Sequence, residues 1–131
     1  MARGPLRVFT DTHTLVWALS TPELSGARAR NALAESPFTA SVANLWELVL
    51  KSHKGGALVA DPLSWWDKYV VAPRIATLAI RTSHIRTLAR LPAHHKDPFD
   101  RVLAAQALAE GLTLASKDAV LARYGAPVIW D

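Results

Sequence analysis

The chain has 131 residues, half of them hydrophobic, a net charge of +4 and no cysteine. This length suits one domain, and the apolar fraction suffices for a buried core and argues against disorder. The lack of cysteine excludes a disulfide framework, a zinc–thiolate site and thiol catalysis. No stretch is long and apolar enough for a signal peptide or a membrane span, so we expect a soluble, cytoplasmic protein. The basic balance favours a polyanionic partner.

The first half of the chain alternates short β-prone runs with segments of helical periodicity. Strands are predicted over 6–10 and 38–40, and helices over 12–19, 26–35, 42–51 and 63–71. The expected N-caps are Thr12, Ser25 and Ser41, and Pro62 suits the first turn of its helix. The apolar stripe predicted on the third helix consists of Val42, Leu45, Trp46, Val49 and Leu50. The helical middle, residues 41–72, is expected to project from the sheet as a hairpin.

The second half continues the alternation. Strands are predicted over 75–80, 112–115 and 128–130, and helices over 83–89, 99–110 and 118–124. The helix over 99–110 has the clearest signals, with Pro98 at its first position and Gly111 as C-cap. Strands that alternate with helices predict an α/β fold, a mostly parallel sheet in a three-layer α/β/α sandwich. We expect a single domain over 1–131.

Four carboxylates stand at or near element ends that such a fold gathers at one rim. Asp11 ends the first strand, Asp118 follows the strand 112–115, Asp100 lies in the first turn of a helix, and Glu47 lies in the helix after the second strand. Ligands of parallel sheets bind at the carboxyl ends of the strands. Carboxylates packed together need a cation or protons between them. Their hard oxygens suit Mg²⁺ or Mn²⁺, and water on such a cation can attack a phosphodiester.

Each acid also has a simpler interpretation. Asp11 could cap the first helix, and Asp100 and Asp118 could be first-turn acids that the helix dipoles favour. Glu47 could be a solvated residue paired with Lys51, four residues further along the same helix. Spacing alone favours these capping and surface roles over a metal site.

Four segments resemble PIN-domain proteins of the VapC type, the toxin half of type II toxin–antitoxin pairs. They are FTDTHTLVW at 9–17, SVANLWEL at 41–48, LPAHHKDPFDR at 91–101 and LASKD at 114–118, in the family's order and with family-like spacing. The resemblance implies an endoribonuclease that depends on Mg²⁺, with Mn²⁺ as a substitute. It also implies a PIN-like fold, a homodimer, and an antitoxin that covers the acidic pocket.

The resemblance assigns roles to individual residues. The acidic quartet, catalytic and metal-binding, falls on Asp11, Glu47, Asp100 and Asp118. Asp97 competes with Asp100 for this role, but Asp97 precedes Pro98 and is expected to cap the helix. Apart from the resemblance, the candidate substrate-binding residues are Arg101, Ser116, Lys117 and Lys51. Arg101 could equally form a surface ion pair, and the lysines could belong to a solvated face. His94 and His95 are expected in a polar loop that braces the site.

Two rival functions remain open from the sequence. A structure-specific DNA nuclease would use a similar metal site, and nothing in the sequence locates contacts to a 2′-hydroxyl. A non-catalytic module could instead dock a basic peptide on the acidic rim, although a complete quartet argues against it. Trp65 and Trp66 cannot both point inward from one helix, so an exposed aromatic there is a candidate contact for a partner protein.

Overall fold

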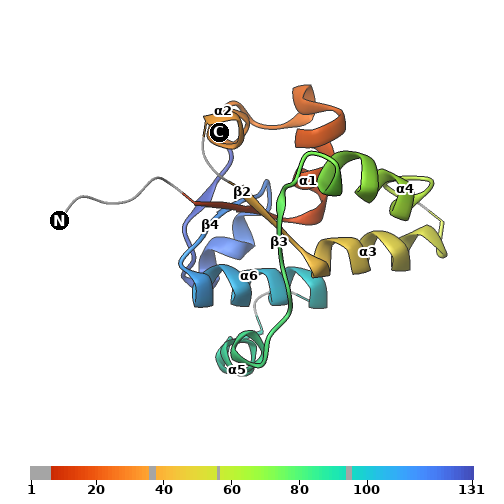
Figure 1. The fold of residues 1–131 in the computed structure, drawn as a ribbon. Coiled ribbons are helices and arrows are strands. Elements are labelled where there is room, and N and C mark those ends of the chain that lie inside the picture. Colours follow the sequence, from red (N-terminus) through yellow and green to blue (C-terminus); the bar gives the residue numbers. More distant parts are fainter. Residues whose placement is uncertain (1–6, 36–37, 56, 94–95) are drawn as a thin grey trace.

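The structure is a computed structural model that describes residues 7–35, 38–55, 57–93 and 96–131. Its five described strands form one parallel sheet in the order β3-β2-β1-β4-β5 (Figure 1). They are β1 (Val8–Thr10), β2 (Phe38–Ser41), β3 (Ala76–Leu78), β4 (Thr113–Ala115) and β5 (Val128–Ile129). The strand order reverses at β1, since β2 lies on one side of it and β4 on the other. Such a reversal leaves a crevice at the carboxyl ends of the two strands.

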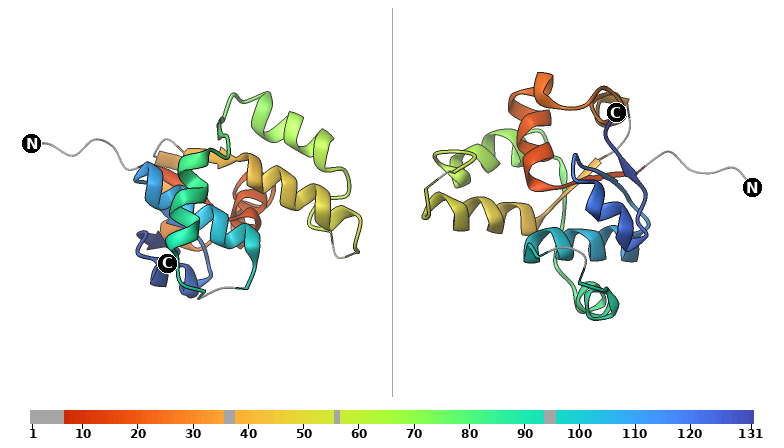
Figure 2. Two further views of the ribbon diagram at one scale, coloured as in Figure 1. Left: turned by 90° about the horizontal axis from the view of Figure 1, so that it is seen from below. Right: turned by 180° about the vertical axis from the view of Figure 1, so that it is seen from behind.

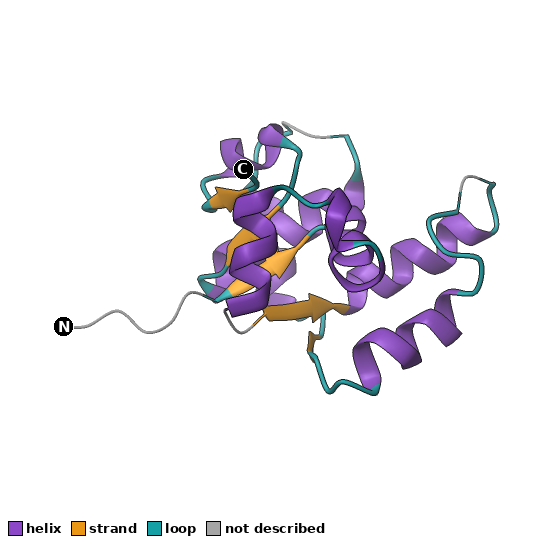
Figure 3. Cartoon of the chain, turned by 90° about the horizontal axis from the view of Figure 1, so that it is seen from above, coloured by secondary structure: helices purple, strands orange, loops and turns teal. Residues whose placement is uncertain are grey.

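Helices cover both faces of the sheet, so the predicted three-layer α/β/α fold is confirmed (Figures 1 and 3). The helices α1 (Thr12–Ser20) and α2 (Ala27–Glu35) lie on one face, and α6 (Pro98–Glu110) lies on the other with α5 (Thr82–Arg90) outside it. Short 3₁₀ turns span Pro22–Leu24 and Ala119–Tyr124. No helix in the described ranges is long and apolar enough to cross a membrane.

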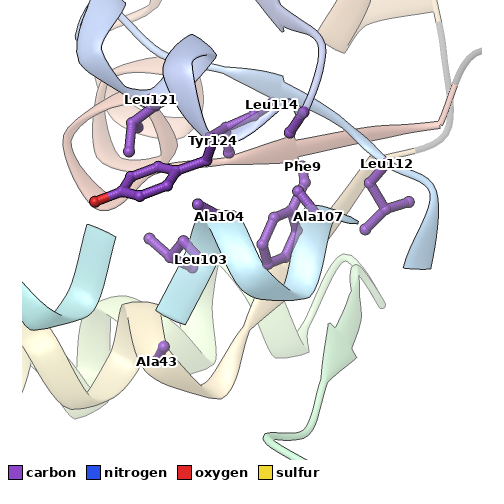
Figure 4. Packing of buried hydrophobic residues seen from close by; sticks show 10 residues of the cluster. Phe9, Ala43, Leu103, Ala104, Ala107, Leu112, Leu114, Leu121 and Tyr124 are labelled. Carbon is purple, nitrogen blue, oxygen red and sulfur yellow. The ribbon is translucent and has the colours of Figure 1, made fainter. Parts of the chain in front are cut away.

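The central strand β1 is buried on both faces, as parallel strands between helices are. Phe9 points into the larger core cluster, where it meets Leu103 of α6 and Leu114 of β4 (Figure 4). Val8 points to the opposite face and packs with Ala29 of α2 and Ile129 of β5. This alternation ties the helices of the two outer layers to the strand that carries Asp11.

Several local predictions are confirmed and others are corrected. Asp11 caps α1 in place of Thr12, because its Oδ1 accepts a hydrogen bond of 2.9 Å from the Thr14 amide. Gly111 closes α6 in the left-handed conformation, with φ of 68°. The predicted strand over 75–80 shortens to β3, and the helix predicted over 118–124 is the 3₁₀ turn that starts at Ala119. Leu6, predicted to begin the first strand, lies outside the described residues.

The helical middle projects beyond the sheet, as predicted. It consists of α3 (Val42–Ser52), α4 (Pro62–Trp66) and a π-helical turn over Asp67–Val71, and α3 and α4 lie side by side (Figures 1 and 2). Trp66 is buried in the cluster that joins α3 to α4, whereas the neighbouring Trp65 is half-buried. Only one of the two indoles therefore points fully inward.

The orientation of α3 corrects the predicted apolar stripe. Trp46 is 54% exposed and Val42 and Leu50 are also exposed, while Asn44 and Glu47 are buried. Asn44 is held by both ends of its amide: its oxygen accepts from the Ser41 amide at 2.8 Å, and its nitrogen donates to the carbonyl oxygen of Thr10 and the hydroxyl of Thr12. Because Asn44 has these partners, its amide can be buried at little cost.

Candidate active site

A pocket of about 370 Å³ opens at the carboxyl ends of β1 and β4, where α1, α3 and α6 meet. Its lining residues are Asp11, His13, Thr14, Trp17, Glu47, Lys51, Asp97, Asp100, Lys117 and Asp118. The structure thus brings together all four acids of the predicted quartet and adds Asp97 as a fifth. Five of the chain's 11 acidic residues share one pocket in a protein of net charge +4. Carboxylates gathered in this way repel one another, and a cation or protons among them would relieve the repulsion.

Asp11 combines a structural role with its place in the pocket. Its Oδ1 caps α1, and its Oδ2 accepts a short hydrogen bond from the hydroxyl of Ser116, just after β4. The same Ser116 hydroxyl accepts from the amide of Asp118 at 3.0 Å. Ser116 is 2% exposed and therefore positions the two aspartates relative to each other. The capping and site interpretations of Asp11, set out as alternatives from the sequence, are compatible.

Glu47 is the most buried acid of the pocket, with 3% of its side chain exposed. Its Oε2 lies 2.5 Å from the Lys51 ammonium, the pair that helical spacing suggested. The solvated position suggested with that pair is wrong, because the buried face of α3 carries Glu47. Its other oxygen, Oε1, is buried without a hydrogen-bond partner in the described chain. A buried carboxylate oxygen left unpaired is costly, and a cation on that side would remove the cost.

Lys51 is one of the two lysines that line the pocket, together with Lys117. Partial burial disfavours its ammonium form, but the hydrogen bond and charge of Glu47, with the charges of Asp97 and Asp100, outweigh burial and raise the pKa of Lys51 above its usual 10.5. About a third of the side chain is exposed, so Lys51 lies at the mouth of the pocket. It is therefore charged throughout the neutral range.

The remaining acids stand at helix starts. Asp97 is the N-cap of α6, as predicted, and accepts from the Phe99 amide at 2.9 Å. Asp118 caps the 3₁₀ turn that follows β4, accepting from the Val120 amide at 2.9 Å, and Asp100 lies in the first turn of α6. Both helix starts face the pocket, so an acidic residue that caps or begins a helix there also lines the pocket.

Within the described ranges, no three acidic or histidine side chains converge into a ready-made ion cage. The acids line a common wall, and Lys51 stands between Glu47 and the start of α6. Small side-chain rotations would have to accompany the binding of an ion.

The predicted substrate-binding residues divide into two groups. Lys51 and Lys117 line the pocket, whereas Ser116 braces its floor. Arg101 does not line the pocket, and its guanidinium donates to the carbonyl oxygen of Leu91 at 3.2 Å. We therefore leave Arg101 out of the substrate-binding set. His94 and His95 lie outside the described residues.

Three lining residues were missed from the sequence: His13, Thr14 and Trp17. The rings of His13 and Trp17 meet edge to face at 5.7 Å, and the Thr14 hydroxyl is buried without a partner in the described part of the chain. A signal existed, since Asp11, Thr14 and Trp17 are spaced by three residues at the start of a helix. That spacing places them on one face, next to the end of β1.

The chain belongs to the PIN-domain family, whose model matches residues 8–127. This match spans strands β1 to β4 and every acid of the pocket. It confirms the family that the four sequence segments indicated.

Individual relatives cover nearly the whole chain. Ribonuclease VapC22 of Mycobacterium tuberculosis (strain ATCC 25618 / H37Rv) is 29% identical over 123 residues, which cover 92% of this chain and 93% of that protein. A solved structure described as VapBC2 from Rickettsia felis bound to a DNA fragment from their promoter matches with a TM-score of 0.71 at 18% identity, covering 96% of this chain and 100% of that one. DNA-bound VapBC from Salmonella typhimurium matches with a TM-score of 0.70 at 19% identity, covering 95% and 97%.

Proposed function

We propose that this protein is a metal-dependent endoribonuclease and the toxin component of a type II toxin–antitoxin system. The observation that carries the proposal is the buried, unpartnered Oε1 of Glu47 in the wall of a five-carboxylate pocket. Membership of the PIN-domain family and the similarity to Ribonuclease VapC22 support RNA hydrolysis as the reaction.

The donor set of the pocket suits Mg²⁺, and Mn²⁺ could substitute. All the candidate ligands are hard carboxylate oxygens, and no thiol is present to favour a softer metal. We assign the metal-binding and catalytic roles to Asp11, Glu47, Asp100 and Asp118. The ion, when bound, supplies positive charge that acidifies a water and stabilises negative charge on the phosphate.

The chain's own residues position these groups. Ser116 links the Asp11 carboxylate to the backbone amide of Asp118. Lys51 binds one oxygen of Glu47 and leaves the other, Oε1, for a cation. Lys51 and Lys117 supply positive charge for the phosphates of the substrate, which the five carboxylates would otherwise repel. The two lysines at the mouth of the pocket thereby direct the scissile phosphate toward the carboxylates.

We also propose a homodimer and a cognate antitoxin as partners, and one domain over residues 1–131. Relatives of the same fold are described as VapBC complexes. An antitoxin segment with a basic side chain would suit the surplus of five acids over two lysines in the pocket. All five described strands, β1 to β5, belong to a single sheet, which supports one domain.

The test is cleavage of mixed cellular RNA by the purified full chain, freed of any partner, with Mg²⁺ or Mn²⁺. EDTA and the variants Asp11→Asn and Asp100→Asn should abolish cleavage. Single-stranded and duplex DNA are tested in parallel, because cleavage of DNA in place of RNA would favour the rival DNA nuclease. Leu24→Ala, at an exposed position outside the pocket, is the matched control and should cut normally. No cleavage together with no Mn²⁺ binding would leave the non-catalytic peptide-binding module as the better account.

A further inference from the structure

A second depression adjoins the acidic pocket and has the opposite charge. It measures about 380 Å³ and is lined by Leu50, Lys51, Lys54, Lys96, Asp97, Pro98 and Phe99. Three lysines and one carboxylate line it, against two lysines and five carboxylates in the pocket. The two share Lys51 and Asp97, so they form a continuous surface between the end of α3 and the start of α6. We call this depression the lysine groove.

An exposed indole stands beside the lysine groove. Each of the five tryptophans lies in the described ranges, and only Trp46 is exposed, at 54%. Its ring and the ring of Phe99, which lines the groove, meet edge to face, with centroids 4.9 Å apart and planes at 82°. This contact fixes the indole, so little side-chain entropy remains to be lost when a flat ring stacks on its free face.

We propose that the lysine groove with Trp46 is a subsite for single-stranded RNA, which holds nucleotides next to the scissile phosphate. A base stacks on the Trp46 indole, and Lys54 and Lys96 contact the flanking phosphates. Aromatic platforms between cations bind single strands in this way because every base has a π-face. The subsite rests on the proposed ribonuclease function, since its strand leads into the acidic pocket.

Charge favours RNA over a protein as the occupant. The cores of protein interfaces are depleted in lysine, whereas this groove has three. The acidic pocket also repels the substrate backbone, so phosphates on either side of the cleaved one need cations outside it. Lys54 and Lys96 are both exposed and supply that charge next to the pocket.

The test measures binding without cleavage. A fluorescein-labelled single-stranded RNA 12-mer is titrated with the full chain in EDTA at several salt concentrations, and anisotropy gives the affinity. Trp46→Ala should weaken binding about tenfold, the loss typical of one stacked base, whereas Trp46→Phe should restore most of it. Lys54→Ala combined with Lys96→Ala should reduce the slope of log affinity against log salt by about 1.4, or about 0.7 per lost phosphate contact.

Matched controls come from positions that line neither the lysine groove nor the acidic pocket. Leu24→Ala changes an apolar residue that is as exposed as Trp46, at 54%, and Arg28→Ala removes an exposed cation from α2. Both should bind like the wild type, and circular dichroism should show that all variants are folded.

Three results would overturn the proposal. They are wild-type affinity and slope in the groove variants, the absence of any RNA binding by the wild type, and a dimer that Trp46→Ala converts to a monomer without loss of RNA affinity. The last result would make this face a contact between copies of the chain. Metal-dependent cleavage that Asp11→Asn abolishes and Trp46→Ala leaves unchanged would keep the ribonuclease and remove only the subsite.

Discussion

The two roles of Asp11 can be separated by a pair of substitutions. Asp11→Asn removes the charge but keeps an oxygen to cap α1 through the Thr14 amide, and its new amide nitrogen can donate to the Ser116 hydroxyl. Asp11→Ala removes the charge and both hydrogen bonds. Either change takes one carboxylate out of the acidic pocket, so the relief of repulsion is the same and cancels in the comparison.

The expected magnitudes follow from these contacts. Loss of an N-cap costs about 1 kcal/mol, and loss of the buried partner of Ser116 costs about another 1 kcal/mol. Unfolding entropy of about 2.1 cal/mol/K per residue over 131 residues converts about 2 kcal/mol into a fall of about 7 °C in Tm. We therefore expect the Ala variant to melt about 7 °C below the Asn variant. Because residues that merely orient metal ligands are worth 10–100-fold in affinity, both variants should lose about 100-fold in Mn²⁺ affinity.

Differential scanning calorimetry and isothermal titration with Mn²⁺ measure the two effects independently. Equal melting temperatures for the Asn and Ala variants would refute the hydrogen-bond geometry at Asp11. Wild-type Mn²⁺ affinity in the Asn variant would instead refute its place in the metal site. A variant that keeps stability while it loses metal binding is the outcome that supports both roles.

Three further predictions concern stability. Because the pKa of Lys51 is raised in the folded state, its pairing with Glu47 stabilises the fold fully below pH 10.5, and this stabilisation is lost as the pH rises through the higher folded-state pKa. Wild type should therefore have a slightly higher urea midpoint than Lys51→Met, and this difference should shrink only above pH 10.5. Gly26→Ala should lower Tm in thermal scans, since a Cβ there would lie 2.4 Å from the backbone oxygen of Trp130; an unchanged Tm would contradict this packing. His84→Ala should cost about 2–3 kcal/mol in urea unfolding, because this buried imidazole accepts from a backbone amide and contacts a glutamate of α6, and Mn²⁺ binding should be unaffected.

The order of strands and helices followed from local signals in the sequence. Asp97, Pro98 and Gly111 bound α6 in the structure where capping chemistry predicted, because these signals act within one helical turn. The parallel sheet followed from the alternation of elements, since a helical crossover returns the chain to the end of the sheet at which the previous strand began. The acidic rim followed too, from the positions of Asp11 and Asp118 after their strands.

Only the tertiary structure decided which face of α3 is buried. Periodicity placed Trp46 on the apolar stripe and Glu47 on the opposite face, yet the structure buries Glu47 and exposes Trp46. The deciding contacts are long-range: the Asn44 amide binds the backbone of Thr10, more than thirty residues earlier in the chain. A hydrophobic pattern records only the apolar character of each side chain and not the partner that makes burial of a polar one affordable. Local sequence therefore determined the elements and the acids between them, and the packing of α3 against β1 turned those acids into one pocket and left an indole exposed beside it.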